Sequence, residues 1–309
     1  MTTILDAELL ARIERLTAQP LHPYLKRAVY GRQYELSRFL DTFEQGRPLY
    51  IYSGYQFESK EFSFTALLHF TFLAYLQEAF AAFIVIPLPS HEATTRDIIA
   101  CGLDYEYTYF FPLKHARADA LVASMKNQIS TSLLQKVFAF SEEATLAEYE
   151  LPLYRIAAAN AITFSELMPA SASCLVVYNY EQENCFHLAR SFLKQAPACL
   201  IGEAQLSSVG NTTLLIKDSA AILTRKLHLT NQDSIYQYLR CYELDSIAFT
   251  MLDTCFLLGT VTCDHVKVCL LSRLLILSAY HRTAHTLVLP STITAFLTHV
   301  DKQIFYRTR

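Results

Sequence analysis

The sequence predicts an α/β protein in which a Rossmann-type parallel sheet comes first and an all-α domain follows. Over the first two hundred residues, short apolar and β-branched runs alternate with longer amphipathic stretches. Such a β-α-β-α-β order is typical of a parallel sheet covered by helices. Beyond residue 211 strand signals become rare while helical periodicity continues. A sheet domain is therefore expected to precede a helical domain.

Local signals predict the elements of the sheet domain in order. Asp6 is placed to cap a helix over 7–17. A second helix over 34–45 is closed by Gly46, and the aromatic run 48–54 predicts a strand. The remaining predicted strands are 82–88, 105–111 and 173–178, and the remaining predicted helices are 61–80, 96–101, 118–137, 146–162 and 183–193.

The last third of the chain predicts helices only. The expected helices are 218–227, 234–243, 246–257, 265–281 and, after Pro290, a last one within 287–306. The predicted domains are an N-terminal helical extension over 1–21, a Rossmann-like domain over 22–216 and a helical domain over 217–309.

Composition excludes some classes of function. The chain has 309 residues, 52% hydrophobic and 18% charged, with a net charge of −3. This balance predicts a large core and excludes a generally basic nucleic-acid binder or an acidic disordered chain. Only 7 residues are glycine, about a third of the usual share, which disfavours loops that wrap phosphates.

Cysteine usage and the start of the chain predict a reducing, cytoplasmic environment. None of the 8 cysteines forms a Cys-x-x-Cys pair, and the first residues resemble no secretory signal. No apolar run reaches the length of a membrane span. Cys263, His265 and Cys269 could be drawn as part of a zinc site, but small buried side chains on a helix are the favoured interpretation. No metal is therefore expected.

Several segments together carry a resemblance to a known family. They are 22–30 with 48–54, 72–80, the stretch 97–104 (Asp-Ile-Ile-Ala-Cys-Gly-Leu-Asp), 137–141 (Val-Phe-Ala-Phe-Ser) and 174–190. In this order, from about 22 to about 285, they resemble the eukaryotic-type tryptophanyl-tRNA synthetases. The resemblance implies a class I synthetase-like Rossmann domain followed by a domain similar to the anticodon-binding domain.

The resemblance fails at both catalytic signatures of that family. The position of the "HIGH" signature is occupied by Ser63, Phe64, Thr65 and Ala66, without histidine or glycine. The "KMSKS" region reads Ala204, Gln205, Leu206, Ser207 and Ser208, and no lysine lies between Lys194 and Lys217. In the family these signatures contact ATP, and losing one such charged donor costs about 100- to 1,000-fold in rate. The resemblance therefore implies that ATP binding is lost, that there is no cofactor and that no catalytic residues remain.

The amino-acid pocket of the family is partly retained. Tyr52, Gln182 and Glu92 stand where the family contacts tryptophan, whereas Pro87 replaces a family glutamine. These residues form either a vestigial tryptophan pocket or inherited core and rim positions, and the second interpretation is favoured because a fold does not imply a site.

Other candidate features are interpreted more simply. His281 and His285 are expected on a surface helix face, and the glutamate pairs 142/143 and 148/150 on solvated faces. Eight apolar side chains could form a symmetric dimer interface or an ordinary core: Leu73, Tyr75, Phe80, Phe83, Phe110, Phe111, Val137 and Phe138. Basic residues that could contact tRNA are Lys217, Arg225, Lys226, Arg240, Lys267, Arg273, Arg282, Lys302, Arg307 and Arg309. They are too diluted among acids and aromatics to predict tRNA binding.

These observations predict a catalytically inactive relative of the family rather than an enzyme. Its expected role is a structural or adaptor subunit, with other proteins as partners, in a large cytoplasmic or cytoskeletal assembly. The alternatives are a divergent tryptophan–tRNA ligase that recruits a lysine from elsewhere, such as Lys60, Lys194 or Lys217, and a module that binds tryptophan or tRNA without catalysis.

Overall fold

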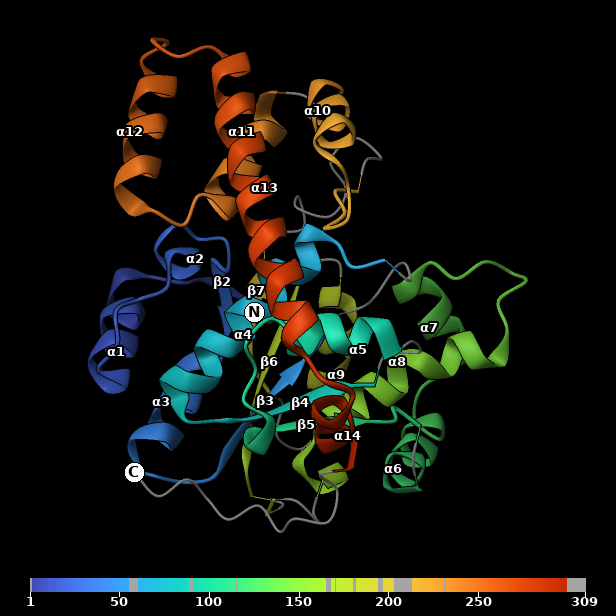
Figure 1. Cartoon of the computed structure of the whole chain (residues 1–309). Coiled ribbons are helices and arrows are strands. Elements are labelled where there is room, and N and C mark those ends of the chain that lie inside the picture. Colours follow the sequence, from blue (N-terminus) through green and yellow to red (C-terminus); the bar gives the residue numbers. More distant parts are fainter. Residues whose placement is uncertain are drawn as a thin grey trace.

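The computed structural model describes most of the chain and shows a central sheet with a helical domain on top (Figure 1). The described residues are 2–55, 61–88, 92–114, 116–164, 168–169, 171–179, 182–193, 197–202, 213–230 and 232–298.

A mixed sheet forms the centre of the molecule. In the described part it has 7 strands in the order β1-β2-β7-β6-β3-β4-β5. The run from β7 to β5 is parallel, whereas β2 pairs antiparallel with β7 and β1 antiparallel with β2. The strands are β1 (Thr3–Ile4), β2 (Arg32–Tyr34), β3 (Leu49–Ser53), β4 (Phe83–Pro87), β5 (Thr108–Phe111), β6 (Ser173–Asn179) and β7 (Ala198–Gly202). The predicted class of fold is confirmed.

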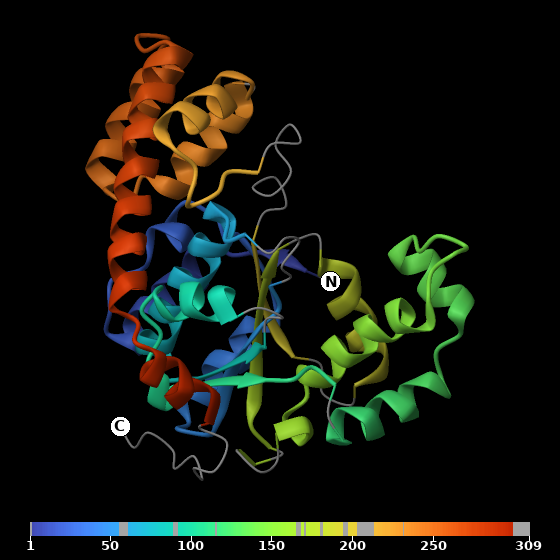
Figure 2. The same ribbon diagram turned by 45° about the vertical axis from the view of Figure 1, so that its right-hand side comes forward.

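Alternation along the strands divides the interior into two cores. In β3 the side chains of Ile51 and Tyr52 lie in different core clusters, one on each face of the sheet. Figure 2 shows the helices on both sides of the sheet. One face packs against α1 (Ala7–Thr17), α2 (Pro23–Lys26), α3 (Leu36–Glu44), α4 (Phe64–Phe80) and α5 (Glu92–Ile99). The other packs against α6 (Ala116–Lys126), α7 (Thr131–Phe138), α8 (Leu146–Ala158) and α9 (Glu183–Phe192). Two 3-10 turns, η1 (Tyr105–Tyr107) and η2 (Ala161–Phe164), complete these layers.

The helical domain packs against the N-terminal end of α4, and the segment that follows the domain returns to the sheet. It comprises α10 (Ala220–His228), α11 (Gln232–Tyr242), α12 (Ser246–Leu257) and the 25-residue α13 (Cys263–Leu287). The last described helix, α14 (Pro290–Thr298), packs back on β5, where the Phe296 ring lies 6.0 Å from Phe110. No helix in the described ranges is long and apolar enough to cross a membrane.

Two arginines join the helical domain to the sheet domain. The Arg27 guanidinium donates to the carbonyls of Arg240 and Asp245, at 3.3 and 3.4 Å, and also to that of Glu243. It lies 4.1 Å from the centre of the Phe249 ring. In return, Arg240 Nε donates to the Arg27 carbonyl at 3.1 Å. Because charged donors make strong hydrogen bonds, this reciprocal pair holds the two domains in one arrangement.

The sequence-based prediction missed several elements and gave wrong bounds for others. The strands β1, β2 and β7 were not predicted, and the first residue of the predicted helix 34–45 belongs to β2. The predicted helix 118–137 is two helices, because the Ser130 hydroxyl caps a new helix by accepting from the Leu133 N–H. α5 begins at Glu92, before the predicted 96, and α13 extends beyond both ends of 265–281.

Candidate functional site

The order of the strands places a switch point between β3 and β6. The chain passes from β3 to β4 and β5 on one side, and later to β6 and β7 on the other. In open α/β sheets, ligands bind in the crevice at the carboxyl ends of the strands at such a point. Here those ends carry Ser53 on β3, Asn179 on β6 and Gly202 on β7. This crevice is the candidate functional site.

A buried hydrogen-bonded chain lies at the carboxyl end of β3. His69, on α4, lies with its Nε2 3.0 Å from the Ser53 hydroxyl and its Nδ1 2.9 Å from the Tyr30 hydroxyl. All three side chains are fully buried. Burial lowers the pKa of His69 to about 3, so the imidazole is neutral and one ring nitrogen donates while the other accepts. The sequence gives no sign of this role, because Tyr30 and Ser53 come from other segments of the chain.

Aromatic rings close the space above this chain. The Tyr30 ring stacks on Phe72 at 4.3 Å, and the Tyr55 ring lies 5.0 Å from His69. The Tyr55 hydroxyl is 3.4 Å from the Ser63 hydroxyl. At Gly54 even a Cβ atom would come within 2.8 Å of the Tyr178 Cβ. The described side chains therefore pack closely around His69 and Gly54.

The first turn of α4 carries the degenerate signature Ser63–Ala66. A helix N-terminus binds an anion through its free N–H groups, but here two of these groups are bonded within the chain. The Phe64 N–H donates to the Leu214 carbonyl at 3.0 Å, and the Ala66 N–H donates to the Ser63 hydroxyl at 3.1 Å. Phe64 itself is fully buried, with its ring edge-on to Tyr242 at 5.7 Å. These positions therefore serve packing and capping.

The second degenerate signature lies outside the described residues. Ala204, Gln205, Leu206, Ser207 and Ser208 fall in the range 203–212. The described segment after this range pairs with the start of α4, because Leu215 bridges Ser63 and the Ile216 N–H donates to the Phe62 carbonyl at 3.1 Å.

The two candidate tryptophan-pocket residues whose side chains are described, Tyr52 and Gln182, lie in different surroundings. Tyr52 is 1% exposed and lies in the core between Phe111 and Phe186, where burial raises the pKa of its hydroxyl. Gln182 is half-buried and its Oε1 accepts from the Asn179 N–H at 3.2 Å. Glu92 is the first residue of α5, and its side chain is outside the described part. Tyr52 is thus placed as a core residue, and Gln182 as a rim residue at the end of β6.

The expectation that His281 lies on a surface helix face was wrong. Its ring is 4% exposed, stacks on Phe62 at 5.2 Å and lies 3.1 Å, through Nε2, from the Asp97 carbonyl. His285 Nε2 lies 3.7 Å from the Asp97 carboxylate. Burial raises the pKa of Asp97 to about 6. This cluster joins α5 to α13, a contact between distant segments that helical spacing alone cannot reveal.

Cysteine and histidine side chains are the candidates for metal binding and thiol chemistry. All 8 cysteines are free thiols, and the described residues contain no group of three His, Cys, Asp or Glu that could hold a metal ion. Cys269 and His265 are exposed rather than buried as the favoured interpretation expected. His265 Nδ1 instead lies 2.8 Å from the Thr262 hydroxyl at the start of α13.

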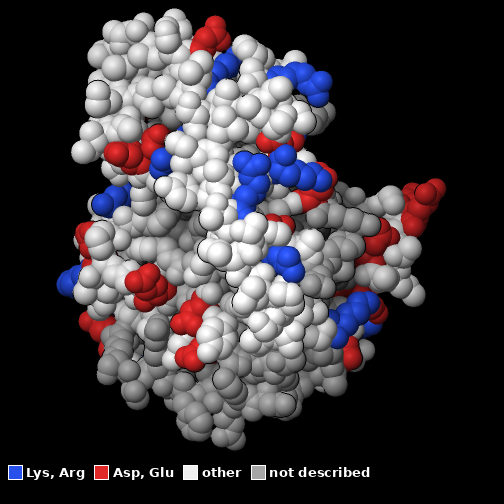
Figure 3. All heavy atoms as spheres, in the orientation of Figure 1, with Lys and Arg blue, Asp and Glu red and all other residues white. Residues whose placement is uncertain are grey.

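Many of the basic side chains of the helical domain are engaged within the chain. Lys226 pairs with Asp218 at 2.7 Å and Arg273 with Glu243 at 3.6 Å, and Lys217 pairs with Glu61. Figure 3 shows Lys and Arg mostly beside Asp and Glu on this face of the molecule. Lys302, Arg307 and Arg309 are outside the described residues.

The apolar residues considered for a dimer interface are mostly interior. Leu73, Phe80, Phe83, Phe110 and Phe111 are buried within the single chain. Tyr75, Val137 and Phe138 are half-buried. An ordinary Rossmann core therefore accounts for most of this apolar set.

Comparisons with known proteins agree with the architecture. No protein-family model matches the chain. The cytoplasmic tryptophan–tRNA ligase of Arabidopsis thaliana is 28% identical over 208 residues, which cover 60% of this chain and 52% of that protein. The cytoplasmic tryptophan–tRNA ligase of Saccharomyces cerevisiae is 25% identical over 257 residues, which cover 74% of this chain and 59% of that protein. The chain spans about half the length of the curated relatives it matches.

Solved structures match over nearly the whole chain. The Plasmodium falciparum tryptophanyl-tRNA synthetase has a TM-score of 0.86 at 21% identity, covering 98% of this chain and 96% of that chain. A tryptophanyl-tRNA synthetase homologue from Entamoeba histolytica has a TM-score of 0.86 at 16% identity, covering 97% and 94%. The chain has the class I synthetase fold that its sequence predicts.

Proposed function

We propose that this chain, which shares the fold of tryptophanyl-tRNA synthetases, does not activate tryptophan and serves as a structural or adaptor subunit of a larger cytoplasmic assembly. One observation carries the first half of the proposal: Tyr30, His69 and Ser53 bond one another at the carboxyl end of β3, and two N–H groups of the first turn of α4 are bonded within the chain. A nucleotide phosphate at this place would have to displace bonds that the fold already makes.

The charge balance of the crevice supports the same proposal. Catalysis of phosphate chemistry depends mainly on preorganised positive charge at the transferring groups. His69 is held neutral, and Lys217 is paired with Glu61. Lys60 and Lys194, the other lysines considered as replacements, are outside the described part. We therefore expect no ATP-dependent step, no cofactor and no metal.

The first test is tryptophan-dependent exchange of pyrophosphate into ATP. Removal of both halves of the phosphate clamp is expected to lower the rate by about 10,000-fold or more, so the exchange should not exceed the buffer background. Exchange that is dependent on tryptophan and disappears in Gln182→Ala would contradict the proposal and favour a divergent ligase. Tyr149→Phe, at a half-buried position on α8, serves as the matched control.

The adaptor role is supported by an exposed apolar face on α12. Ile247, Met251, Leu257 and Leu258 are 64–76% exposed, and the helix sequence contains a single charged residue, Asp253. Figure 3 shows this part of the surface as largely uncharged. Contiguous apolar surface marks protein interaction sites, whereas an RNA backbone requires lysine and arginine. This face therefore suits a protein partner better than tRNA.

Sedimentation from native lysate tests the adaptor role. The tagged chain is expected to sediment as part of a large assembly, with and without RNase. The variant Met251→Lys with Leu258→Lys, which places cations on the apolar face, should shift the chain to the slow fraction, because an unpaired charge in an apolar interface is unfavourable. Arg225→Ala with Arg282→Ala provides the control, and it should sediment like the wild type. Slow sedimentation of the wild type, or release by RNase, would count against the proposal.

A further inference from the structure

The long helix α13 is apolar on its outer face as well as on the face that packs on the chain. Its inner face, which includes Leu270 and Leu274, is buried. On the opposite side Val268 and Ile276 are 63% and 44% exposed. Figure 2 shows α13 at the left margin of the molecule, reaching from the helical domain to the sheet domain. A helix that is apolar all round is usually covered all round, so this outer face suits a partner. Along its middle, the outer face consists of Val268, Cys269, Ser272, Ile276, Ala279, Tyr280 and Thr283.

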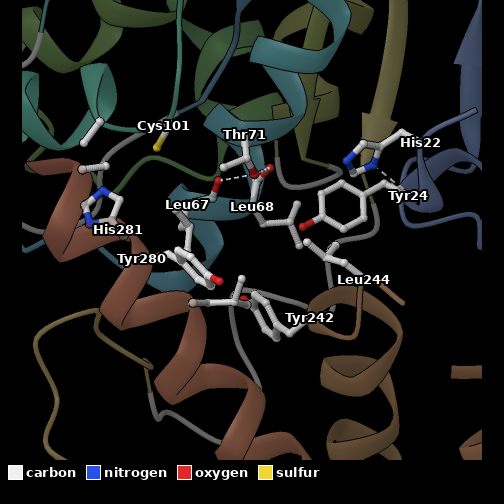
Figure 4. A pocket seen from close by; sticks show the side chains of 13 residues that line it. His22, Tyr24, Leu67, Leu68, Thr71, Cys101, Tyr242, Leu244, Tyr280 and His281 are labelled. Carbon is white, nitrogen blue, oxygen red and sulfur yellow. Dashed lines mark hydrogen bonds between the residues drawn. The ribbon is translucent and has the colours of Figure 1, made fainter. Parts of the chain in front are cut away.

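One edge of this outer face lies beside a pocket between the two domains. The pocket has a volume of about 300 Å³, and Leu277, Tyr280 and Ala284 contribute to its wall from α13. Figure 4 shows the Tyr280 side chain at the pocket, whereas His281, the next residue, lies toward Cys101. The Tyr280 ring is nevertheless 74% exposed. The described part of the chain therefore leaves even this large side chain open to a partner.

Two exposed charges of opposite sign flank the outer face. Asp264 and Arg282 are 18 residues apart and both exposed. Eighteen residues make about five helical turns, so both charges lie on the same side of the outer face, about 27 Å apart. The Asp264 side chain is 82% exposed, although Lys267 lies 3.8 Å away. Lys267 itself is 17% exposed, and Arg273 is paired with Glu243 at 3.6 Å.

The outer face is complementary to itself when a second copy of α13 runs antiparallel to the first. Aligning Asp264 of one copy with Arg282 of the other brings three further pairs together in the same register. The members of each pair are separated by nearly whole helical turns, so they lie on the same side of the face. The midpoints of all these pairs fall between residues 273 and 275. The pairs are Asp264 with Arg282, Val268 with Ala279, Ser272 with Ile276, and Cys269 with Tyr280.

Size and charge both fit this register. Each of the three uncharged pairs joins a larger side chain to a smaller one, which allows facing helices to interdigitate. Each of the two ends brings a carboxylate beside a guanidinium. Next to a two-fold axis a residue meets its own copy, so charges there would repel. Ser272 and Ile276, the residues of the outer face nearest the axis, carry none.

We propose that two copies of this chain associate through α13, packed antiparallel about a two-fold axis near residue 274. The outer face has fewer residues than the 20–30 a side of a standard interface, so the dimer is expected to be weak, with a Kd on the order of 10 μM. The inference does not rest on the proposed function, because the apolar face assigned there to a different protein belongs to α12.

Sedimentation equilibrium of the purified chain between about 1 and 200 μM tests the proposal. The wild type should change from monomer to dimer over this range. Ile276→Glu places two carboxylates near the axis and should raise the Kd at least about tenfold, because like charges then face each other. Glutamate is a good helix former, and circular dichroism checks that the variant is folded. Ile247→Glu makes the same exchange at a 76% exposed position of α12, and it should dimerise like the wild type.

A charge reversal tests the antiparallel register. Asp264→Arg brings two guanidinium groups together at each end of the interface and should raise the Kd about threefold to tenfold, since each exposed pair contributes little. Combining Asp264→Arg with Arg282→Asp restores opposite charges and should return the Kd to within about twofold of the wild type. A parallel pair of helices would gain nothing from the second substitution, because Asp264 would then face its own copy.

Three outcomes would overturn the inference. They are a wild type that stays monomeric over the whole range, an Ile276→Glu variant that dimerises like the wild type, and a double charge reversal that is as weak as Asp264→Arg alone. A chain that is monomeric when pure but sediments within a large assembly in lysate would overturn this inference and leave the proposed adaptor role intact. Failure of either proposal is therefore recognised separately.

Discussion

Replacement of Phe64 by alanine is expected to lower the free energy of unfolding by about 3–5 kcal/mol, the usual range for a buried phenylalanine. The ring is fully buried at the first position of α4 and packs edge-on against Tyr242 of α11, 5.7 Å away. Its removal opens a void where the two domains meet. Urea unfolding followed by circular dichroism measures the change.

Two further variants make the Phe64 result interpretable. Phe64→Leu retains most of the apolar volume and should lose less than half as much stability. Leu146→Ala, at a position 78% exposed on α8, should stay within about 0.5 kcal/mol of the wild type. A Phe64→Ala protein as stable as Leu146→Ala would show that this position is not used for packing, and would reopen a catalytic role for the first turn of α4.

His69 is expected to make stability fall as the pH is lowered. In the unfolded chain a histidine takes up its proton near pH 6.5, whereas the folded state holds the pKa of His69 near 3. Between these values the unfolded state binds more protons, so stability rises with pH by up to about 1.4 kcal/mol per pH unit. The contribution is complete above pH 6.5 and is lost progressively toward pH 3.

Other groups act in the same pH range, among them His281 and His285, whose pKa values are also lowered by burial. His22, whose pKa is lowered to about 4, adds to the slope. Asp97 acts in the opposite direction, because its folded pKa of about 6 lies above its ordinary value of 3.8, so the stability it contributes is lost as pH rises from 4 to 6. The pH dependence of wild-type stability is therefore a sum of contributions from several groups. The contribution of His69 has to be measured as the difference between the wild type and a His69 variant.

His69→Asn separates the contribution of this residue. The variant cannot titrate and leaves at least one of the two bonded hydroxyls without its partner, so it should be less stable at pH 7 by about 1–3 kcal/mol. Between pH 4 and 6 its stability should depend less steeply on pH than that of the wild type, by about 1.4 kcal/mol per unit. His187→Gln, at an exposed position on α9, should keep the wild-type slope. Parallel profiles for wild type and His69→Asn would contradict a buried, neutral imidazole.

The sequence predicted the elements whose signals are local. Helix α1 begins and ends as its cap and periodicity predict, and α12 has the predicted bounds. The strands β2 and β7 were not predicted, for different reasons. Arg32–Tyr34 is a polar three-residue segment that is a strand only because β1 and β7 pair with it, and Ala198–Gly202 is too short an apolar run to identify alone.

The loss of the catalytic signature at the candidate site could be predicted from the sequence, but the contacts made by the residues now at these positions could not. The loss of histidine and glycine at Ser63–Ala66 is visible in the sequence. That Phe64 packs against Tyr242, or that the N–H of Phe64 is bonded to Leu214, depends on segments about 150 to 180 residues further along the chain. His281 shows the same limit, because its burial against Phe62 requires the two domains to be docked.

The outer strands of the described sheet bear on the tendency of the molecule to aggregate through its sheet edges. At one margin, β1 is only Thr3–Ile4; at the other, β5 packs against Phe296 of α14. Long bare strands invite further strands to add to them and lead to uncontrolled aggregation. Neither margin of the described sheet offers such a strand, because β1 has only two residues and β5 carries α14.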